Sequence, residues 1–386
     1  MERTMIYLDN AATSFPKPEC VCREMDRCMR EYCANPGRGG HPLSIKAGAA
    51  VMSARDAICS LFNIHDPMRL VFTKNATEAL NIAIKGTTFP GCHVITTAME
   101  HNSVMRPLRT LERNYGVEVT VVEGNELGEI DPEDIKKEIR KNTALIISTL
   151  SSNVNGVVMP INEIGHIASR SGVLFLVDAS QGAGSMAIDI ETLNVDMMAF
   201  PGHKGLLGPQ GTGGLYVGEG ISIKPLMEGG TGSNSDSSLQ PAFFPDLLES
   251  GTLNTPGIVG LGTGARYIAS IGVEQVFAYK HKLVKLLIEG FSKIPGLTLY
   301  SVSDKNRNSG IVAINLKDLD SAELSYIIDR EYGIYTRAGL HCSPGAHKVL
   351  GTEKRGAVRF SVGYFNTEAE LIYTLDALER ISWKTL

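Results

Sequence analysis

The 386-residue sequence has no apolar run long enough to span a membrane. Its start, MERTMIYLDNAAT, lacks the basic segment followed by an apolar one that marks a signal peptide. Neither sign of charge dominates: the net charge is −5, which argues against a general binder of nucleic acid or acidic membranes. Internal repeats and low-complexity tracts are also missing. With 43% hydrophobic and 20% charged residues, we expect an ordinary globular protein of the cytoplasm with a large core.

Cysteine is scarce and odd in number, which predicts reduced thiols rather than disulfides. Four of the seven cysteines lie between residues 20 and 33, and their spacing is not that of two C-x-x-C knuckles. Val21, Met25, Cys28 and Met29 follow a helical period instead, so we expect cysteines in a helix core and no metal site. The cysteines are Cys20, Cys22, Cys28, Cys33, Cys59, Cys92 and Cys342.

Short apolar strands alternate with helices along the first half of the chain. Strands are expected at 93–97 and 144–149, for example, and helices at 103–115 and 161–171. This alternation predicts an α/β fold with a mostly parallel sheet covered by helices on both faces. In such sheets ligands bind at the carboxyl ends of the strands.

The second half of the chain has a different organisation. Residues 229–255 are rich in Gly, Ser and Asn and are expected to form a long loop, followed by one long helical stretch at 259–288. The remaining strands and helices predict a smaller α+β unit. We therefore expect a large domain of residues 14–258 and a small domain of residues 1–13 and 259–386.

Several polar residues fall where the predicted strands end. Lys204 lies in a Gly-rich turn beside an apolar strand, where burial would lower its pKa and give a nucleophilic amine; a surface lysine is the alternative. Asp178 could hold a pyridinium N–H or cap a helix. His101 could stack on a ring and move protons, or could be a packed core histidine.

A strand at 70–72 leads into a helix whose start carries small polar residues. Asn75 is expected to be the N-cap, with Glu78 as a capping-box partner. Backbone N–H groups at such a helix start can bind an anion such as a phosphate, although simple helix capping explains the same residues.

Nine motifs in order make the sequence resemble the class V aminotransferase family, which depends on pyridoxal 5'-phosphate and has fold type I. The resemblance runs from Leu8 to Thr367 and is strongest to the branch of cysteine desulfurases and selenocysteine lyases. The motifs are LDNAAT, NATEALN, MEHNS, SSNVNG, VDASQ, GHKGLLGPQG, ESGTLNTPG, TRAGLHC and VRFSVGYFNT.

The resemblance implies a role in cofactor binding for nine residues. Lys204 would hold the cofactor covalently, Asp178 would pair with its ring nitrogen, and His101 would stack on the ring. Gln181 and Asn153 would lie near its phenolic oxygen. The phosphate would be held by Ala76, Thr77 and His203, and by Thr252 from the neighbouring subunit of a homodimer.

The resemblance also implies the substrate site and the reaction. Arg359 would bind the substrate carboxylate, and the pocket would be lined by Asn10, Ala11, Ala12, Arg38, Asn153 and Arg337. Lys204 would remove the Cα proton of L-cysteine. The thiolate of Cys342, favoured by a flanking His and Arg, would take the sulfur as a persulfide and leave alanine. A small buried thiol is the alternative for Cys342.

Two positions depart from the family pattern. Pro201 stands where relatives have a hydroxyl that binds phosphate, and Gly37 stands where some relatives have His. The short connection from Cys342 to Arg359 resembles the branch that passes sulfur to a separate acceptor protein. Selenocysteine lyase, another aminotransferase or β-lyase, and a non-catalytic assembly partner remain as alternatives, and the sulfur could serve iron–sulfur cluster assembly, tRNA thiolation or selenium metabolism.

Overall fold

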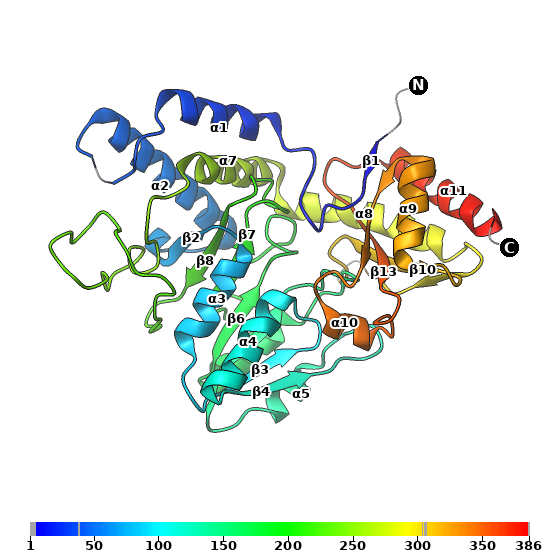
Figure 1. Cartoon of the computed structure of the whole chain (residues 1–386), viewed down its shortest axis with the longest axis horizontal. Helices are drawn as coiled ribbons and strands as arrows, with labels where there is room; N and C mark the ends of the chain where they lie inside the picture. Colours follow the sequence, from blue (N-terminus) through cyan, green and yellow to red (C-terminus); the bar gives the residue numbers. More distant parts are fainter. Residues whose placement is uncertain (1–4, 38, 303, 305–306, 385–386) are drawn as a thin grey trace.

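The computed structural model of the chain describes residues 5–37, 39–302, 304 and 307–384 (Figure 1). Its central sheet has seven strands in the order β2-β8-β7-β6-β5-β3-β4. Strand β8 runs antiparallel to both of its neighbours, and the other adjacent pairs are parallel. The strands are β2 (Leu70–Thr73), β3 (His93–Thr97), β4 (Glu118–Val122), β5 (Thr143–Thr149), β6 (Leu174–Asp178), β7 (Met197–Pro201) and β8 (Gly213–Val217).

Helices cover both faces of this sheet because its strands are apolar on both sides. Ile146 and Phe175 belong to a core shared with α2, α6 and α7, whereas Leu145 and Leu176 belong to a core shared with α3 and α4. The helices are α1 (Glu19–Glu31), α2 (Pro42–Phe62), the short 3-10 helix η1 (Pro67–Arg69), α3 (Ala76–Thr87), α4 (Asn102–Tyr115), α5 (Pro132–Lys137), α6 (Ile161–Ser171) and α7 (Thr255–Ile271).

A second unit lies beside the first, at the right of Figure 1. It has an antiparallel sheet in the order β12-β13-β10-β9 and a parallel pair of β1 with β11. Its strands are β1 (Ile6–Tyr7), β9 (Leu297–Leu299), β10 (Ile311–Leu316), β11 (Ile334–Tyr335), β12 (Arg337–Gly339) and β13 (Ala357–Ser361). Its helices are α8 (Val273–Phe291), α9 (Ser321–Tyr332), α10 (Pro344–Val349) and α11 (Glu368–Lys384).

The second unit has its own core, which includes Ile6 and Leu8 from the start of the chain. The expected division at residue 258 stays a prediction. Helix α7 spans that residue, and Leu261 and Ala265, which lie beyond it, pack in the core of the first unit.

Three expectations about local structure were wrong. The helical stretch at 259–288 is two helices, because Gly272 adopts a φ of +93° that ends α7 before α8 begins. The apolar pattern predicted a helix over residues 79–85, but α3 begins at Ala76, directly after the predicted N-cap Asn75. The cysteines at 20–33 are not all core residues: Cys28 is buried, whereas Cys20, Cys22 and Cys33 are exposed.

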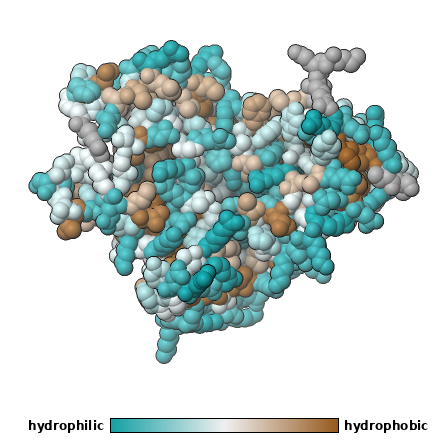
Figure 2. All heavy atoms as spheres, in the orientation of Figure 1, coloured by the Kyte–Doolittle hydropathy of each residue, from teal (hydrophilic) through white to brown (hydrophobic). Residues whose placement is uncertain are grey.

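Figure 2 shows a largely hydrophilic face on which apolar side chains form small scattered groups. Among the described helices, none combines the length and the apolar character that crossing a membrane requires.

Candidate functional site

A cavity of about 210 Å³ lies at the carboxyl ends of the parallel strands, between the two units. It brings together most of the residues that the sequence motifs singled out. The N-terminal turn contributes Ala11 and Ala12, the first unit contributes Ala76, Thr77, His101, Asn153, Asp178, Gln181, His203 and Lys204, and the second contributes Arg337, Cys342 and Arg359.

Lys204 and Asp178 are the central pair of opposite charges in this cavity. Burial lowers the pKa of Lys204 to about 8, and the nearby charge of Asp178 opposes this shift. Asp178 ends strand β6 and is 2% exposed, and its Oδ1 accepts a hydrogen bond from Ser180 N at 2.9 Å. A lysine with this pKa is a usable nucleophile and base near neutral pH.

His101 caps helix α4 from the end of the loop after β3. Its Nδ1 accepts a hydrogen bond from Ser103 N at 3.1 Å, so we assign the ring proton of the neutral form to Nε2. The Ser103 hydroxyl lies 2.9 Å from the same Nδ1 and 2.7 Å from Thr77 Oγ1. Burial lowers the pKa of His101, so the imidazole is neutral in the cavity.

The start of helix α3 forms one end of the cavity. Asn75 is its N-cap, with Oδ1 accepting from Glu78 N at 2.9 Å, whereas Glu78 reaches Lys74 N rather than closing a capping box on Asn75. The backbone N–H groups of Ala76 and Thr77 donate no hydrogen bond to any acceptor in the described part of the chain. This helix start therefore offers free donors to an anion.

His203 lines the same cavity and has a polar atom without a partner among the described residues. Its Nδ1 is buried and is without a hydrogen bond among the described residues. Burial lowers the pKa of this imidazole to about 4, helped by the charges of Lys204 and Lys17, so His203 is neutral. Its backbone oxygen accepts from Lys17 Nζ at 2.8 Å and from Ser14 N at 3.0 Å, which anchors the N-terminal turn against the Lys204 loop.

Arg359 lies on β13 and is 1% exposed. Its Nη2 donates to Asp9 Oδ1 at 2.6 Å and its Nη1 donates to Asn153 O at 2.9 Å. Its Nε is buried and unpartnered among the described groups. The guanidinium is therefore fixed from two sides while each terminal nitrogen keeps a second N–H, which suits the binding of a carboxylate.

Cys342 lies in a loop that the second unit brings over the cavity. His341 and Cys342 both have left-handed backbones, with φ of 50° and 59°. The loop is tied to the first unit by three hydrogen bonds: Asn153 Nδ2 donates to His341 O at 2.7 Å, Asn102 N donates to Cys342 O at 2.8 Å, and Ser343 Oγ donates to Asn153 Oδ1 at 2.7 Å. Cys342 is exposed.

A chain of hydrogen bonds supports this loop from below. His341 Nε2 lies 3.1 Å from Arg337 O, so we assign a proton to Nε2, and Nδ1 then accepts from His347 Nε2 at 3.0 Å. The remaining nitrogen of His347 is 2.7 Å from the hydroxyl of Thr352. Burial lowers the pKa of His341 to about 3 and that of His347 to about 4, so both rings are neutral.

Of the flanking His and Arg that were expected to favour a thiolate, only the arginine contacts the sulfur. Arg337 Nη2 lies 4.0 Å from Cys342 Sγ. The expectation was wrong for His341, because both of its ring nitrogens face other groups and the ring carries no charge.

Two predicted site residues of the described part of the chain do not line this cavity. Asn10 lines a neighbouring cavity, and its Nδ2 donates to Ser361 O at 3.1 Å. Thr252 is exposed and is not part of the wall of this cavity. Arg38 falls outside the described residues.

Residue-by-residue reasoning missed several members of the site. Ser103 and Ser180 lie within the MEHNS and VDASQ motifs, where a hydroxyl or backbone N–H beside the key residue was a signal that could have been used. Asp9 fixes Arg359 from the LDNAAT motif. His347 and Thr352 follow the last cysteine by five and ten positions, and no sequence pattern pointed to them.

The residues present fit pyridoxal phosphate by the chemistry of their donors. A free helix start and the orphaned Nδ1 of His203 offer polar groups to a phosphate, and a carboxylate on Asp178 and an amine of lowered pKa on Lys204 line the same cavity. Pro201 also lines the cavity, so it contributes no hydroxyl to this set.

Comparisons with known proteins agree with this reading. A model of the family described as Aminotransferase class-V matches residues 6–373. A probable cysteine desulfurase from Methanothermobacter thermautotrophicus is 38% identical, over 98% of this chain and 95% of its own length. A probable cysteine desulfurase from Pyrococcus abyssi is 32% identical, over 99% of this chain and 95% of its own length.

Solved structures show the same likeness. The apo structure of a cysteine desulfurase from Thermococcus onnurineus has a TM-score of 0.93 at 34% identity, covering 99% of this chain and 95% of that one. A cysteine desulfurase from Escherichia coli has a TM-score of 0.87 at 26% identity, covering 98% and 95%. The predicted α/β architecture of fold type I is confirmed. Together with the family match, this means that the chain belongs to the class-V aminotransferase family.

Proposed function

We propose that this chain is a cysteine desulfurase that converts L-cysteine to L-alanine and holds the released sulfur as a persulfide on Cys342. Enzymes of its family depend on pyridoxal phosphate, as the motifs predicted. The observation that carries the proposal is the position of Cys342 in the wall of the cavity that contains Lys204 and Asp178. An aminotransferase would need that lysine and carboxylate but no thiol at this place.

When bound, pyridoxal phosphate supplies an electron sink for the bonds broken at the substrate. Lys204 would hold it covalently, and the carboxylate of Asp178 would keep its ring nitrogen protonated. The helix start at Ala76 and Thr77, together with His203, would hold its phosphate, and His101 and Gln181 would fix its ring. The neutral state of His101 suits packing on a ring.

The substrate would be held by its carboxylate on Arg359, which Asp9 and Asn153 keep in place. Arg337, Ala11, Ala12 and Asn153 would complete this side of the pocket. The amine of Lys204, once released by the substrate, would take the Cα proton, and its lowered pKa makes it an effective base near neutral pH.

Cys342 would perform the sulfur step. Its thiolate forms a sulfur–sulfur bond with the substrate while the Cβ–S bond breaks, and the electron pair of that bond is left on the carbon side. Protonation of the carbon gives alanine, and the persulfide stays on Cys342. Arg337, 4.0 Å away, would stabilise the negative sulfur before the attack.

Two partners follow from the proposal. A sulfur acceptor protein would take the persulfide from the exposed Cys342. A second copy of the chain would receive the exposed Thr252 in its phosphate site, which explains why Thr252 lies away from its own cavity. A cytoplasmic location stays a prediction from the free thiols.

A single-turnover reaction with L-cysteine tests the function. Alanine is quantified and the persulfide is located by mass spectrometry in the wild type, in Cys342→Ala and in Cys33→Ala, a control that removes another exposed thiol. We expect both products in the wild type and the control, and neither in Cys342→Ala. No alanine from the wild type would contradict the proposal in favour of another lyase or an aminotransferase. Alanine from Cys342→Ala, made fastest with selenocysteine, would instead identify a selenocysteine lyase.

A further inference from the structure

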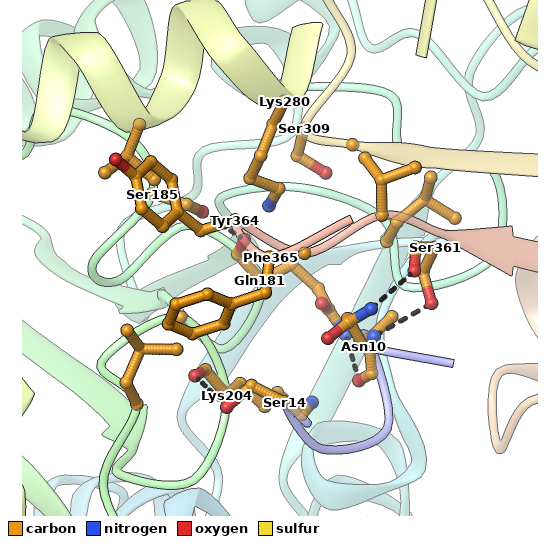
Figure 3. Close-up of a pocket in the computed structure, with 18 of the residues that line it drawn as sticks. Asn10, Ser14, Gln181, Ser185, Lys204, Lys280, Ser309, Ser361, Tyr364 and Phe365 are labelled. Carbon is orange, nitrogen blue, oxygen red and sulfur yellow. Dashed lines mark hydrogen bonds between the residues drawn. The ribbon is translucent and has the colours of Figure 1, made fainter. Parts of the chain in front are cut away.

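A second, smaller cavity lies behind the first, with a free volume of about 40 Å³. Ala11, Gln181 and Lys204 belong to the walls of both cavities. This volume admits only a few water-sized atoms, since one water needs roughly 10–15 Å³ by the same kind of measure. The cavity lies at the seam between the two units, where α8 meets the residues before the Lys204 loop (Figure 3).

Lys280 of helix α8 directs its amine into this cavity, beside Ser309 and above Gln181 (Figure 3). Among the described residues, no acceptor forms a hydrogen bond or ion pair with its Nζ. No carboxylate lines the cavity either. Burial lowers the pKa of Lys280 to about 8, and no neighbouring charge contributes to that shift.

Gly310 packs directly against the end of the Lys280 side chain. A Cβ on Gly310 would lie 2.6 Å from Lys280 Cε and 3.0 Å from Nζ, so a larger residue here would require the flexible end of the lysine to shift. Gly310 also has a φ of +112°, which strongly favours glycine.

Two side chains of the cavity wall can donate to an anion. When Ser151 donates to Ser309 Oγ at 2.6 Å rather than to Gly156 O at 3.1 Å, the Ser309 hydroxyl is free to donate into the cavity. Gln181 Nε2 uses one N–H on Ala11 O at 3.1 Å and keeps another. Lys280 is partly buried, and an ammonium without an ion pair favours a counter-anion, which no carboxylate of the cavity wall supplies.

We propose that this cavity binds one small monovalent anion of halide size, held between the ammonium of Lys280 and the hydroxyl of Ser309. The anion would neutralise the cation at the seam and so hold α8 against the Gln181 and Lys204 segments. The small volume excludes phosphate esters and dicarboxylates. The site adjoins the cofactor cavity through Ala11, Gln181 and Lys204, but the proposal does not depend on which reaction the enzyme performs.

Bromide is the probe for this site. The melting temperature of the holoenzyme is measured in sodium bromide and in sodium gluconate at equal ionic strength, since gluconate is too large for the cavity. We expect bromide at high occupancy to raise the melting temperature by about 2–4 °C over gluconate. An equal response to both salts would overturn the proposal, because it would reflect general screening.

Two variants of the same helix make the test specific. Lys280→Met should lose the bromide response, whereas Lys282→Met should keep it, because Lys282 is exposed and pairs with Glu368 on the surface. If Lys280→Met does not fold, Ser309→Ala tests the same site, and it should weaken bromide binding severalfold while leaving the charge in place. An undiminished response in Lys280→Met, or in Ser309→Ala where that variant must serve, would overturn the proposal.

Crystals grown in bromide give an independent readout. We expect an anomalous peak in contact with Lys280 Nζ in the wild type and none in Lys280→Met. A peak without any bromide effect on the melting temperature would mean an adventitious ion only, and would also overturn the proposal.

Discussion

Lys204 and Lys280 line the same small cavity, and burial lowers the pKa of each to about 8. Their surroundings nevertheless differ. The negative charges of Asp178 and Asp9 raise the pKa of Lys204. The positive charges of Arg359 and Arg337 lower it. Lys280 feels no ionisable neighbour.

Lys204 is therefore an amine whose pKa also depends on neighbouring charges, whereas Lys280 is an unbalanced lysine, without a neighbouring charge of opposite sign among the residues that the structure describes. Around Lys204, charges of both signs come from β6, β12, β13 and the N-terminal turn, so its proton affinity is set by the protein itself. Desolvation alone shifts the pKa of Lys280. Its charge therefore depends on the pH and on whether an anion is bound beside it. Equal pKa values therefore do not imply equal roles.

The largest expected effect is the loss of activity when Lys204 is replaced. Lys204→Ala should lower the rate of alanine formation by at least about 10³-fold, because it removes both the covalent hold on the cofactor and the base. The yellow absorbance of the bound cofactor should change with it. Lys282→Ala on the surface of α8 is the control and should be as active as the wild type. A Lys204→Ala variant that keeps a tenth of normal activity would contradict the role of Lys204 as the base.

A smaller effect is expected from the support of the Cys342 loop. Thr352→Val leaves Nδ1 of the buried His347 without its donor at 2.7 Å, which costs about 1–3 kcal/mol of local stability. Thr352 is a positioning residue, so alanine formation should slow by about tenfold while the absorbance of the bound cofactor is kept. Thr352→Ser retains the hydroxyl and should restore the rate. Equal rates for Thr352→Val and the wild type would show that the hydrogen-bond chain does not act on Cys342.

The pH dependence of stability tests the unbalanced lysine. Without small anions, folded Lys280 loses its proton near pH 8, whereas unfolded lysine keeps it to about 10.4. Over that window the unfolded chain binds more protons, so the Lys280 contribution makes stability rise with pH. Lys280→Met should therefore be more stable than the wild type at pH 7, with the gain shrinking toward pH 10. The measurement is urea unfolding in gluconate. Lys204 and Tyr364, which also line the cavity, remain in both proteins, so their contribution cancels in the comparison. A gain that does not vary with pH would contradict this account.

The smallest effect is expected where a charge is fully solvated. Glu368→Gln breaks the pair with Lys282, whose side chains are 48% and 64% exposed. Such surface pairs contribute at most about 1 kcal/mol, so the urea midpoint should barely move. A change in the urea midpoint as large as the one caused by Lys280→Met would show that exposure does not determine how much each lysine of α8 contributes to stability.

The residues at the carboxyl ends of the strands were the most predictable part of the site. Asp178 and Lys204 follow apolar runs that could only be buried strands, and a parallel sheet must then gather its strand ends at one edge. The end of a helix at Gly272 was less predictable, because a single glycine within a helical pattern does not by itself indicate that the helix ends.

The parts that escaped prediction depend on contacts between distant segments. The support of His341 by His347 and Thr352 requires the left-handed turn at His341 and Cys342, and the short helix α10 after it, none of which has a periodic signature. The amine of Lys280 faces a cavity only because α8 packs against the Gln181 segment. The identity of each residue was visible in the sequence, but its neighbours were not.

The pairing of Asp9 with Arg359 has a consequence for how the protein is made. These residues are 350 positions apart, and β1 beside them pairs with β11, so the first segment to leave the ribosome has no place to dock until the last part of the chain has emerged. At roughly 5–20 residues per second, the start of the chain waits for tens of seconds while the central sheet can already form. The side of the cavity that holds Asp9 and Arg359 is therefore the last part to be assembled during synthesis. A nascent chain stalled before Arg359 would carry Lys204 and Asp178 without the arginine that we propose anchors the substrate.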